Sequence, residues 1–133
     1  HAFRKITDRN KVMFGDVGFA YVYFTYGIHF CFNIVAKNPK KAAGAVLIRA
    51  IEPEKGIKIM QKNRGIRNLK NLTNGPAKLA QALDITKEHY GLDLTKKSKL
   101  YITEGIKSEK ITASQRIGIT KAVDNLWNFK IKI

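Results

Sequence analysis

The chain has 133 residues, 44% of them hydrophobic and 26% charged, which suits one folded domain and excludes a disordered chain. Its 25 Lys and Arg against 10 Asp and Glu leave a net charge of +15, so nucleic acid, an anionic membrane or an acidic protein is the expected partner. An excess of lysine that only aids solubility is the alternative.

The sequence carries no sign of a targeting segment, a disulfide framework or a metal cluster. No apolar run approaches the roughly 20 residues of a membrane helix, and the first residues form no signal-peptide pattern. The one cysteine, Cys31, suits core packing in a reducing compartment, and His1, His29 and His89 are scattered. We therefore expect a soluble intracellular protein, in the cytoplasm or nucleoid of a bacterium or the nucleus of a eukaryote. Because the chain begins with His1 instead of Met, we also expect an N-terminal segment to precede it.

The first 16 residues are basic and rich in turn-forming residues. Lys and Arg alternate there with Thr, Asp and Asn, and such side chains suit phosphate oxygens through charge and hydrogen bonds. We predict a loop that leads into the first strand. A solvated leader without a partner is the alternative.

Residues 18–35 are the stretch around which the chain is organised. Aromatic and β-branched residues fill it almost without interruption, and Gly27 lies in its middle, so it predicts two antiparallel strands joined by a turn at residues 25–28. Tyr26 then lies at the tip of a hairpin. A core cannot explain a large aromatic side chain at an exposed turn, so we predict that Tyr26 meets a partner.

Residues 44–51 predict a third buried strand, which Arg49 interrupts. A cation inside an apolar strand is costly unless it is paired, and arginine cannot shed its proton to escape that cost. One explanation is a salt bridge to a buried carboxylate. The other is a pocket wall, where the guanidinium faces a phosphate or a catalytic carboxylate.

Two helices follow in the prediction. Pro53 predicts the start of a helix that runs to about Asn63. Residues 74–79 predict a Gly-Pro turn and a second, short helix, whose N-terminus either holds a phosphate or is an ordinary helix start. Further strands are expected at residues 100–103, 114–119 and 127–133.

Several separated segments resemble one enzyme family, in order and nearly end to end. They are residues 21–27 (Tyr-Val-Tyr-Phe-Thr-Tyr-Gly), 30–34, 46–53, 75–79 and 116–119, preceded by 7–10 and 13–14. Together they resemble the alkyladenine, or 3-methylpurine, DNA glycosylase family. The resemblance implies an α+β fold, with a single mixed domain over residues 1–133 around a curved antiparallel β-sheet. It also implies a protruding hairpin that inserts into DNA.

The activity implied by the resemblance is that of a monofunctional base-excision-repair enzyme. Such an enzyme flips a damaged purine out of duplex DNA and hydrolyses its N-glycosidic bond. The implied substrates are 3-methyladenine, 7-methylguanine, hypoxanthine and ethenoadenine. The implied partner is double-stranded DNA that contains these bases, without cofactor, metal or membrane, and the protein is expected to be a monomer.

Site residues are carried over position by position. Tyr26 resembles the intercalating tyrosine that fills the space left by the flipped nucleotide. Tyr23 and His1 resemble walls of the base pocket, and Asn33 resembles the residue that collides with the 2-amino group of guanine. Arg49 resembles the arginine that helps to place the attacking water, so Arg49 and His1 are the implied catalytic residues. The implied DNA backbone contacts are Thr7, Arg9 and Lys78.

One part of the family pattern has no match. The family's catalytic Glu and a pocket Tyr lie upstream of the position that matches His1. The nearest acids match no catalytic position; they are Asp8, Asp16, Glu52 and Glu54. We therefore expect these 133 residues, as they stand, to excise bases poorly or not at all. A non-catalytic module that binds DNA or RNA through a basic surface and an aromatic hairpin is the alternative.

Overall fold

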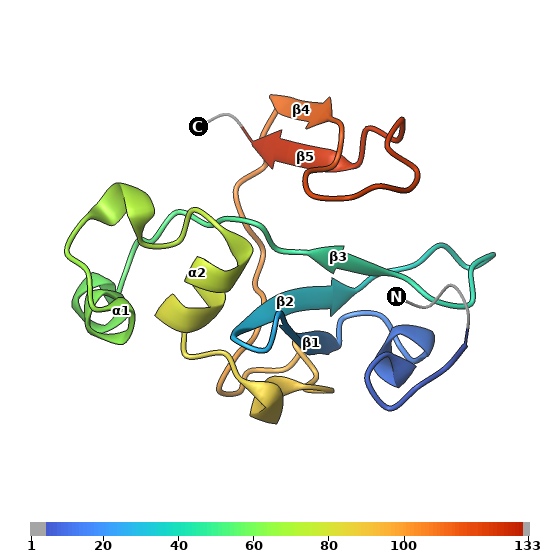
Figure 1. The fold of residues 1–133 in the computed structure, drawn as a ribbon, viewed down its shortest axis with the longest axis horizontal. Coiled ribbons are helices and arrows are strands. Elements are labelled where there is room, and N and C mark those ends of the chain that lie inside the picture. The colour runs from blue at the N-terminus through green and yellow to red at the C-terminus, as the bar shows by residue number, and fades with distance from the viewer. Residues whose placement is uncertain (1–4, 132–133) are drawn as a thin grey trace. The chain divides into compact units, whose positions relative to one another are not determined.

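The computed structural model describes residues 5–131 (Figure 1). The chain divides into two compact units, residues 1–102 and residues 103–133, and each is considered by itself. The described parts form a mixed α/β fold with antiparallel sheets and two α-helices. None of the helices within this range is long and apolar enough to cross a membrane.

A three-stranded antiparallel sheet organises the first unit. Strand β1 spans Ala20–Thr25, β2 spans His29–Val35 and β3 spans Ala45–Leu47, and β2 lies between the other two. The predicted hairpin of β1 and β2 is present, with its turn at residues 25–28. β3 is shorter than the predicted strand over 44–51, although the Ile48 N–H still donates to the carbonyl oxygen of Phe32 at 3.0 Å. The prediction that this strand is buried was wrong, because β3 lies at the edge of the sheet and Val46 is 52% exposed.

Opposite residues in an antiparallel pair point to the same side of the sheet, so the register of β1 and β2 defines two faces. Tyr21 lies opposite Asn33 and Tyr23 opposite Cys31, and we call this the tyrosine face. The alternate residues form the core face. The buried core on that side contains Ala20, Val22, Phe32, Leu79, Ala80, Ile85 and Leu94.

The second helix closes the core. Helix α2 spans Pro76–Ala82 and packs against β2, with helix α1 beside it (Figure 1). Its small and apolar side chains Leu79, Ala80 and Ala82 are buried. Proline at the first helical position explains why the helix begins there, since its missing N–H would have had no partner in the helix. The predicted short helix is therefore confirmed.

The first helix begins later than Pro53 predicts. Helix α1 spans Ile57–Arg64, between Gly56 and Gly65, and both glycines have the positive φ that favours this residue. The predicted start was wrong, because the residue at the N-terminal boundary of the helix is Gly56 and not Pro53. Three short 3₁₀ helices complete the unit: η1 (Lys11–Phe14), η2 (Leu69–Asn71) and η3 (Lys87–His89).

The second unit contains one small antiparallel sheet. Strand β4 spans Ile111–Ser114 and pairs with β5, Asn128–Ile131. The strand expected over 114–119 thus lies earlier in the chain, and residues 100–103 form no strand. β5 falls inside the strand expected over 127–133. The guanidinium of Arg116 lies 5.2 Å from the ring centroid of Trp127, which holds the connecting loop against the sheet.

Candidate functional site

Tyr26 lies at the tip of the β1–β2 hairpin, and its side chain is 91% exposed. Its φ is +52° and that of Gly27 is +65°, so both central residues of the turn have the positive φ that a type I′ turn requires. Asn-Gly is the usual pair at such turns because a large L-residue is strained there. Stability therefore explains Gly27 but does not explain Tyr26.

The tyrosine face of the sheet begins at Tyr23, three residues before Tyr26 in the sequence. Tyr23 is half-buried, and its ring centroid lies 5.3 Å from that of the fully buried Tyr21. Cys31 lies directly opposite Tyr23 on β2. Two phenol rings, tilted by 38° to each other, and a thiol thus form a mostly apolar wall.

Burial controls the ionisation of this wall. Loss of hydration raises the pKa of Tyr23, and the neighbouring Cys31 raises it further. Burial likewise raises the pKa of the Tyr21 hydroxyl and of the Cys31 thiol. The Tyr23 hydroxyl and the Cys31 thiol are therefore neutral at physiological pH.

Asn33 is the polar residue of the same face. It is 6% exposed, and its Nδ2 donates a 3.0 Å hydrogen bond to the carbonyl oxygen of Tyr21. On its other side it pairs with Leu47 of β3. The amide is thereby held in one orientation at the centre of the sheet.

Arg49 follows β3 and is half-buried. The Ile48 N–H donates to the carbonyl oxygen of Phe32 at 3.0 Å, so the chain still runs beside β2 where it reaches Arg49. Burial raises the pKa of the Cys31 thiol, and the positive charge of Arg49 opposes that rise. The ion pairs within the described residues are Lys11–Asp8 and Lys96–Asp93, so no described carboxylate pairs with Arg49. A salt bridge to a described carboxylate is therefore not found, and the pocket wall stays a prediction.

Residues 5–10, which we call the entry segment, precede the hairpin and bring Arg9 to the tyrosine face. Arg9 lies with its guanidinium carbon 5.0 Å from the ring centroid of Tyr23, a contact that the sequence did not predict. Thr7 is exposed in the turn before it, and its backbone N–H donates to Oδ1 of Asn10 at 2.7 Å. His1, the other predicted pocket residue, lies outside the described residues.

Lys78 lies apart from this group, on α2. Its Nζ donates a 2.8 Å hydrogen bond to Oδ1 of Asn74, in the turn before the helix. Gly75, which precedes the helix, makes no side-chain cap, and a Cβ there would meet only the aliphatic part of Lys78. The described residues thus bring Tyr23, Asn33, Arg49 and Arg9 together, and leave Lys78 on a different element.

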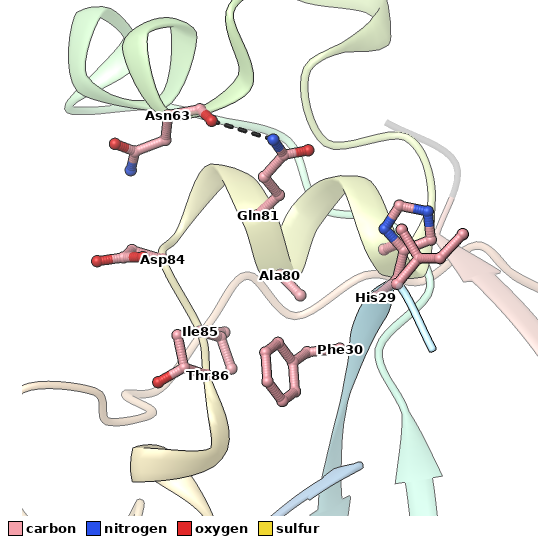
Figure 2. A pocket seen from close by; sticks show the side chains of 10 residues that line it. His29, Phe30, Asn63, Ala80, Gln81, Asp84, Ile85 and Thr86 are labelled. Carbon is pink, nitrogen blue, oxygen red and sulfur yellow. Dashed lines mark hydrogen bonds between the residues drawn. The ribbon is translucent and has the colours of Figure 1, made fainter. Parts of the chain in front are cut away.

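A separate cavity of about 440 Å³ opens between the start of β2 and α2. Figure 2 shows Phe30 and Ile85 on one side of it and the polar residues Asp84, Gln81 and Asn63 on the other. The Gln81 amide donates to the carbonyl oxygen of Asn63 at 3.2 Å. None of the predicted site residues lines this cavity. Elsewhere, the described residues contain no cluster of His, Cys, Asp or Glu that could hold a metal ion.

The chain is similar to known proteins over nearly all of its length. A model of the methylpurine-DNA glycosylase (MPG) family matches residues 1–133. The "Putative 3-methyladenine DNA glycosylase" of Rhodopseudomonas palustris strain CGA009 is 48% identical over 132 residues, which are 99% of this chain and 63% of that protein. A protein of the same name from Carboxydothermus hydrogenoformans is 49% identical over 134 residues, 99% of this chain and 70% of that protein.

A third relative, from Prosthecochloris aestuarii and again named "Putative 3-methyladenine DNA glycosylase", is 50% identical over 129 residues. This match covers 96% of the chain and 61% of that protein. The chain therefore spans between 61% and 70% of the length of these curated relatives. Identity near one half over nearly all of its residues, together with the family model, establishes that the chain belongs to the methylpurine-DNA glycosylase family.

Proposed function

We propose that this protein acts in base excision repair, and that it removes alkylated or deaminated purines from double-stranded DNA as a monomer. The proposed substrates are 3-methyladenine, 7-methylguanine, hypoxanthine and ethenoadenine. The observation that carries the proposal is Tyr26, an aromatic side chain 91% exposed at a turn whose geometry disfavours it. An inserted aromatic ring gives that residue a role outside the core.

Insertion of a side chain between base pairs offsets the cost of taking a nucleotide out of the stack. That cost is on the order of a few kcal/mol for each unstacked step. Tyr26 stands on a short two-stranded hairpin, three residues from Tyr23, so the wedge and the proposed base wall belong to one rigid element. A base that rotates out beside Tyr26 has the tyrosine face within reach.

The tyrosine face supplies the proposed pocket. The Tyr23 ring stacks on the flipped purine, and the cationic charge of an alkylated base strengthens such a stack. Asn33, held by its bond to Tyr21, obstructs the 2-amino group of guanine and so rejects the normal base. His1 is proposed as a second wall of this pocket.

The chemistry of the proposed reaction is hydrolysis. The bond between the sugar carbon C1′ and the purine nitrogen breaks, water adds to C1′, and the base leaves with the electron pair of the broken bond. Positive charge builds on the sugar, so a carboxylate must activate the water and stabilise that charge. Arg49 is proposed to help place this water, with His1 beside it.

The surface charge supports DNA as the partner. A net charge of +15 favours a polyanion. Thr7 and Arg9 in the entry segment and Lys78 on α2 are the proposed contacts to phosphates. An enzyme with this substrate works where the chromosome lies, in the nucleoid of a bacterium or the nucleus of a eukaryote.

The proposal is tested with two matched duplexes, one containing a single hypoxanthine and the other adenine at the same position. Tighter binding of the hypoxanthine duplex is expected, with slow release of the base in a single turnover. No described carboxylate pairs with Arg49, and a reaction without a general base is slower by about two to four orders of magnitude.

Equal affinity for the two duplexes would contradict the proposed recognition of damaged purines. Preference for the hypoxanthine duplex without any base release would instead favour the alternative function, a module that binds damaged DNA but does not cleave it. Rapid release would show that a carboxylate of this chain serves as the base, and substitution of Glu52 and Asp16 would identify it.

A further inference from the structure

The side chain of Arg9 covers a face of the Tyr23 ring. Its guanidinium carbon lies 5.0 Å from the ring centroid, within the range of a cation–π interaction. Burial raises the pKa of the Tyr21 hydroxyl and the positive charge of Arg9 opposes that rise, so Arg9 acts on both rings of the tyrosine face. Arg9 is itself exposed to solvent. The ring face beneath it is therefore one that a ligand arriving from solvent would reach.

The backbone that carries Arg9 is anchored on both sides. Asn10 is 3% exposed, accepts from the Thr7 N–H at 2.7 Å and donates to the carbonyl oxygen of Lys5 at 3.0 Å. The Tyr90 hydroxyl donates to the carbonyl oxygen of Asp8 at 3.0 Å, and accepts from the backbone N–H at position 12 at 3.2 Å. Movement at this position therefore belongs to the arginine side chain and not to the loop.

Arg9 and a flipped purine compete for the same place. A guanidinium is flat and cationic, and its carbon lies over the ring at 5.0 Å from the centroid, in the space that a stacked base would occupy. Both cannot occupy one face of Tyr23. A base can enter only if Arg9 leaves, and the loss of an exposed cation–π contact is small enough to be offset by one stronger contact elsewhere.

Duplex DNA offers that stronger contact. A phosphate accepts two parallel hydrogen bonds from a guanidinium, and such charge-assisted pairs are roughly twice as strong as neutral ones. We propose that Arg9 is a positioning residue that holds the Tyr23 ring in the base-free protein and moves to a DNA phosphate when a purine enters. This inference rests on the proposed function and deepens it.

The exchange has a consequence for specificity. A purine attached to DNA brings the phosphate that draws Arg9 away, whereas a free purine base brings none. The free base must displace Arg9 without compensation. The protein therefore favours bases presented by DNA over free bases and nucleosides in solution.

The test compares wild type with Arg9→Ala and Arg9→Lys. Binding of free hypoxanthine is followed by NMR titration, and binding of the hypoxanthine duplex by fluorescence anisotropy at several salt concentrations. Without the competing cation, Arg9→Ala should bind free hypoxanthine about two- to fivefold more tightly. It should bind the duplex more weakly, and the negative slope of log affinity against log salt should become shallower by about 1. Arg9→Lys keeps the charge and should recover most of the duplex affinity.

Lys11→Ala is the matched control, because Lys11 is a cation two residues away that pairs with Asp8 and not with the ring. It should leave the affinity for free hypoxanthine unchanged. The proposal is overturned if Arg9→Ala binds the free base as weakly as wild type or more weakly, or if neither protein binds it. Only opposite changes for free base and duplex support it.

A second measurement separates this inference from the proposed function. Ring current from Tyr23 should shift the side-chain protons of Arg9 upfield in the protein without DNA, and Tyr23→Leu should abolish that shift. If wild type shows no preference for the hypoxanthine duplex while Arg9→Ala still gains free-base affinity, the proposed function fails and the hold of Arg9 on Tyr23 stands. If wild type prefers the hypoxanthine duplex but Arg9→Ala binds free hypoxanthine no more tightly than wild type, the proposed function stands and only the role of Arg9 is overturned.

Discussion

The side-chain amide of Asn33 and the backbone carbonyl of Tyr21 lie directly across the hairpin from each other and are joined by a 3.0 Å hydrogen bond. The bond ties a side chain of β2 to the main chain of β1, so the orientation of the amide is set by the sheet itself. Asn33 therefore serves the stability of the hairpin as well as any contact with a ligand.

Removal of this amide should destabilise the protein. Asn33→Ala leaves the carbonyl oxygen of Tyr21 without its side-chain donor in a buried setting, which costs about 1 to 3 kcal/mol. Asn38→Ala is the control, because the Asn38 side chain accepts a bond only in an exposed turn. Urea unfolding measures both. If Asn33 also obstructs guanine, binding of duplexes with an extrahelical guanine should tighten in Asn33→Ala; an equal effect of the two substitutions on stability would contradict the buried bond.

Substitutions at the hairpin tip and in its strand should have opposite effects. Tyr26→Asn relieves an unfavourable φ and removes little buried area, so the melting temperature should stay level or rise. Binding to DNA with an extrahelical base should weaken. Tyr21→Ala removes a fully buried ring and should cost about 3 to 5 kcal/mol of stability. Ile28→Ala, 70% exposed in the same turn, controls for loss of apolar surface at the tip.

A different result would reassign the tip. If Tyr26→Asn melts as early as Tyr21→Ala while DNA binding per folded molecule is unchanged, Tyr26 belongs to the core and the hairpin does not read DNA. If Ile28→Ala weakens DNA binding as much as Tyr26→Asn, general hydrophobicity of the turn accounts for the effect and insertion of an aromatic ring does not.

Affinity for duplex DNA should depend steeply on salt, because the chain carries a net charge of +15. A footprint that neutralises about six phosphates gives a log–log slope near −5. A titration of an undamaged duplex between low and physiological salt measures the slope. A slope near zero would remove nucleic acid from the possible partners.

The half-buried phenol of Tyr23 should make the protein less stable at alkaline pH. Its pKa is raised in the folded state, so above pH about 10 the unfolded chain has released a proton that the folded chain still holds. The stabilisation is complete below that pH and is lost as the pH rises above it. Between pH 8 and pH 10.5, the melting temperature should therefore fall more for wild type than for Tyr23→Phe. Equal falls would show that Tyr23 does not resist ionisation.

The sequence correctly predicted the elements that depend on residues next to one another in the chain. The hairpin follows from alternating aromatic and β-branched residues around Gly27, and α2 follows from a Gly-Pro pair before small and apolar residues. Pro53 misled the prediction of α1, because proline fits extended chain as well as the first turn of a helix. Gly56, at φ +72°, occupies the boundary instead.

The contacts between distant segments could not be predicted in this way. Alternation along β1 indicates that Tyr23 has a preferred side, but nothing near it in the sequence indicates that Arg9 covers its ring. Arg49 illustrates the same limit. An interrupted apolar run showed that its charge needed an explanation, whereas its closeness to Cys31 depends on how β2 and β3 pair.

Tyr90 has a consequence for the order in which the chain folds. Its hydroxyl bonds to the backbone at positions 8 and 12, across sequence separations of 82 and 78 residues. During synthesis the β1–β2 hairpin can form from neighbouring residues soon after it leaves the ribosome, but the segment that carries Arg9 must wait for residue 90. The segment that carries Arg9 is therefore translated before the hairpin but acquires its native position after it.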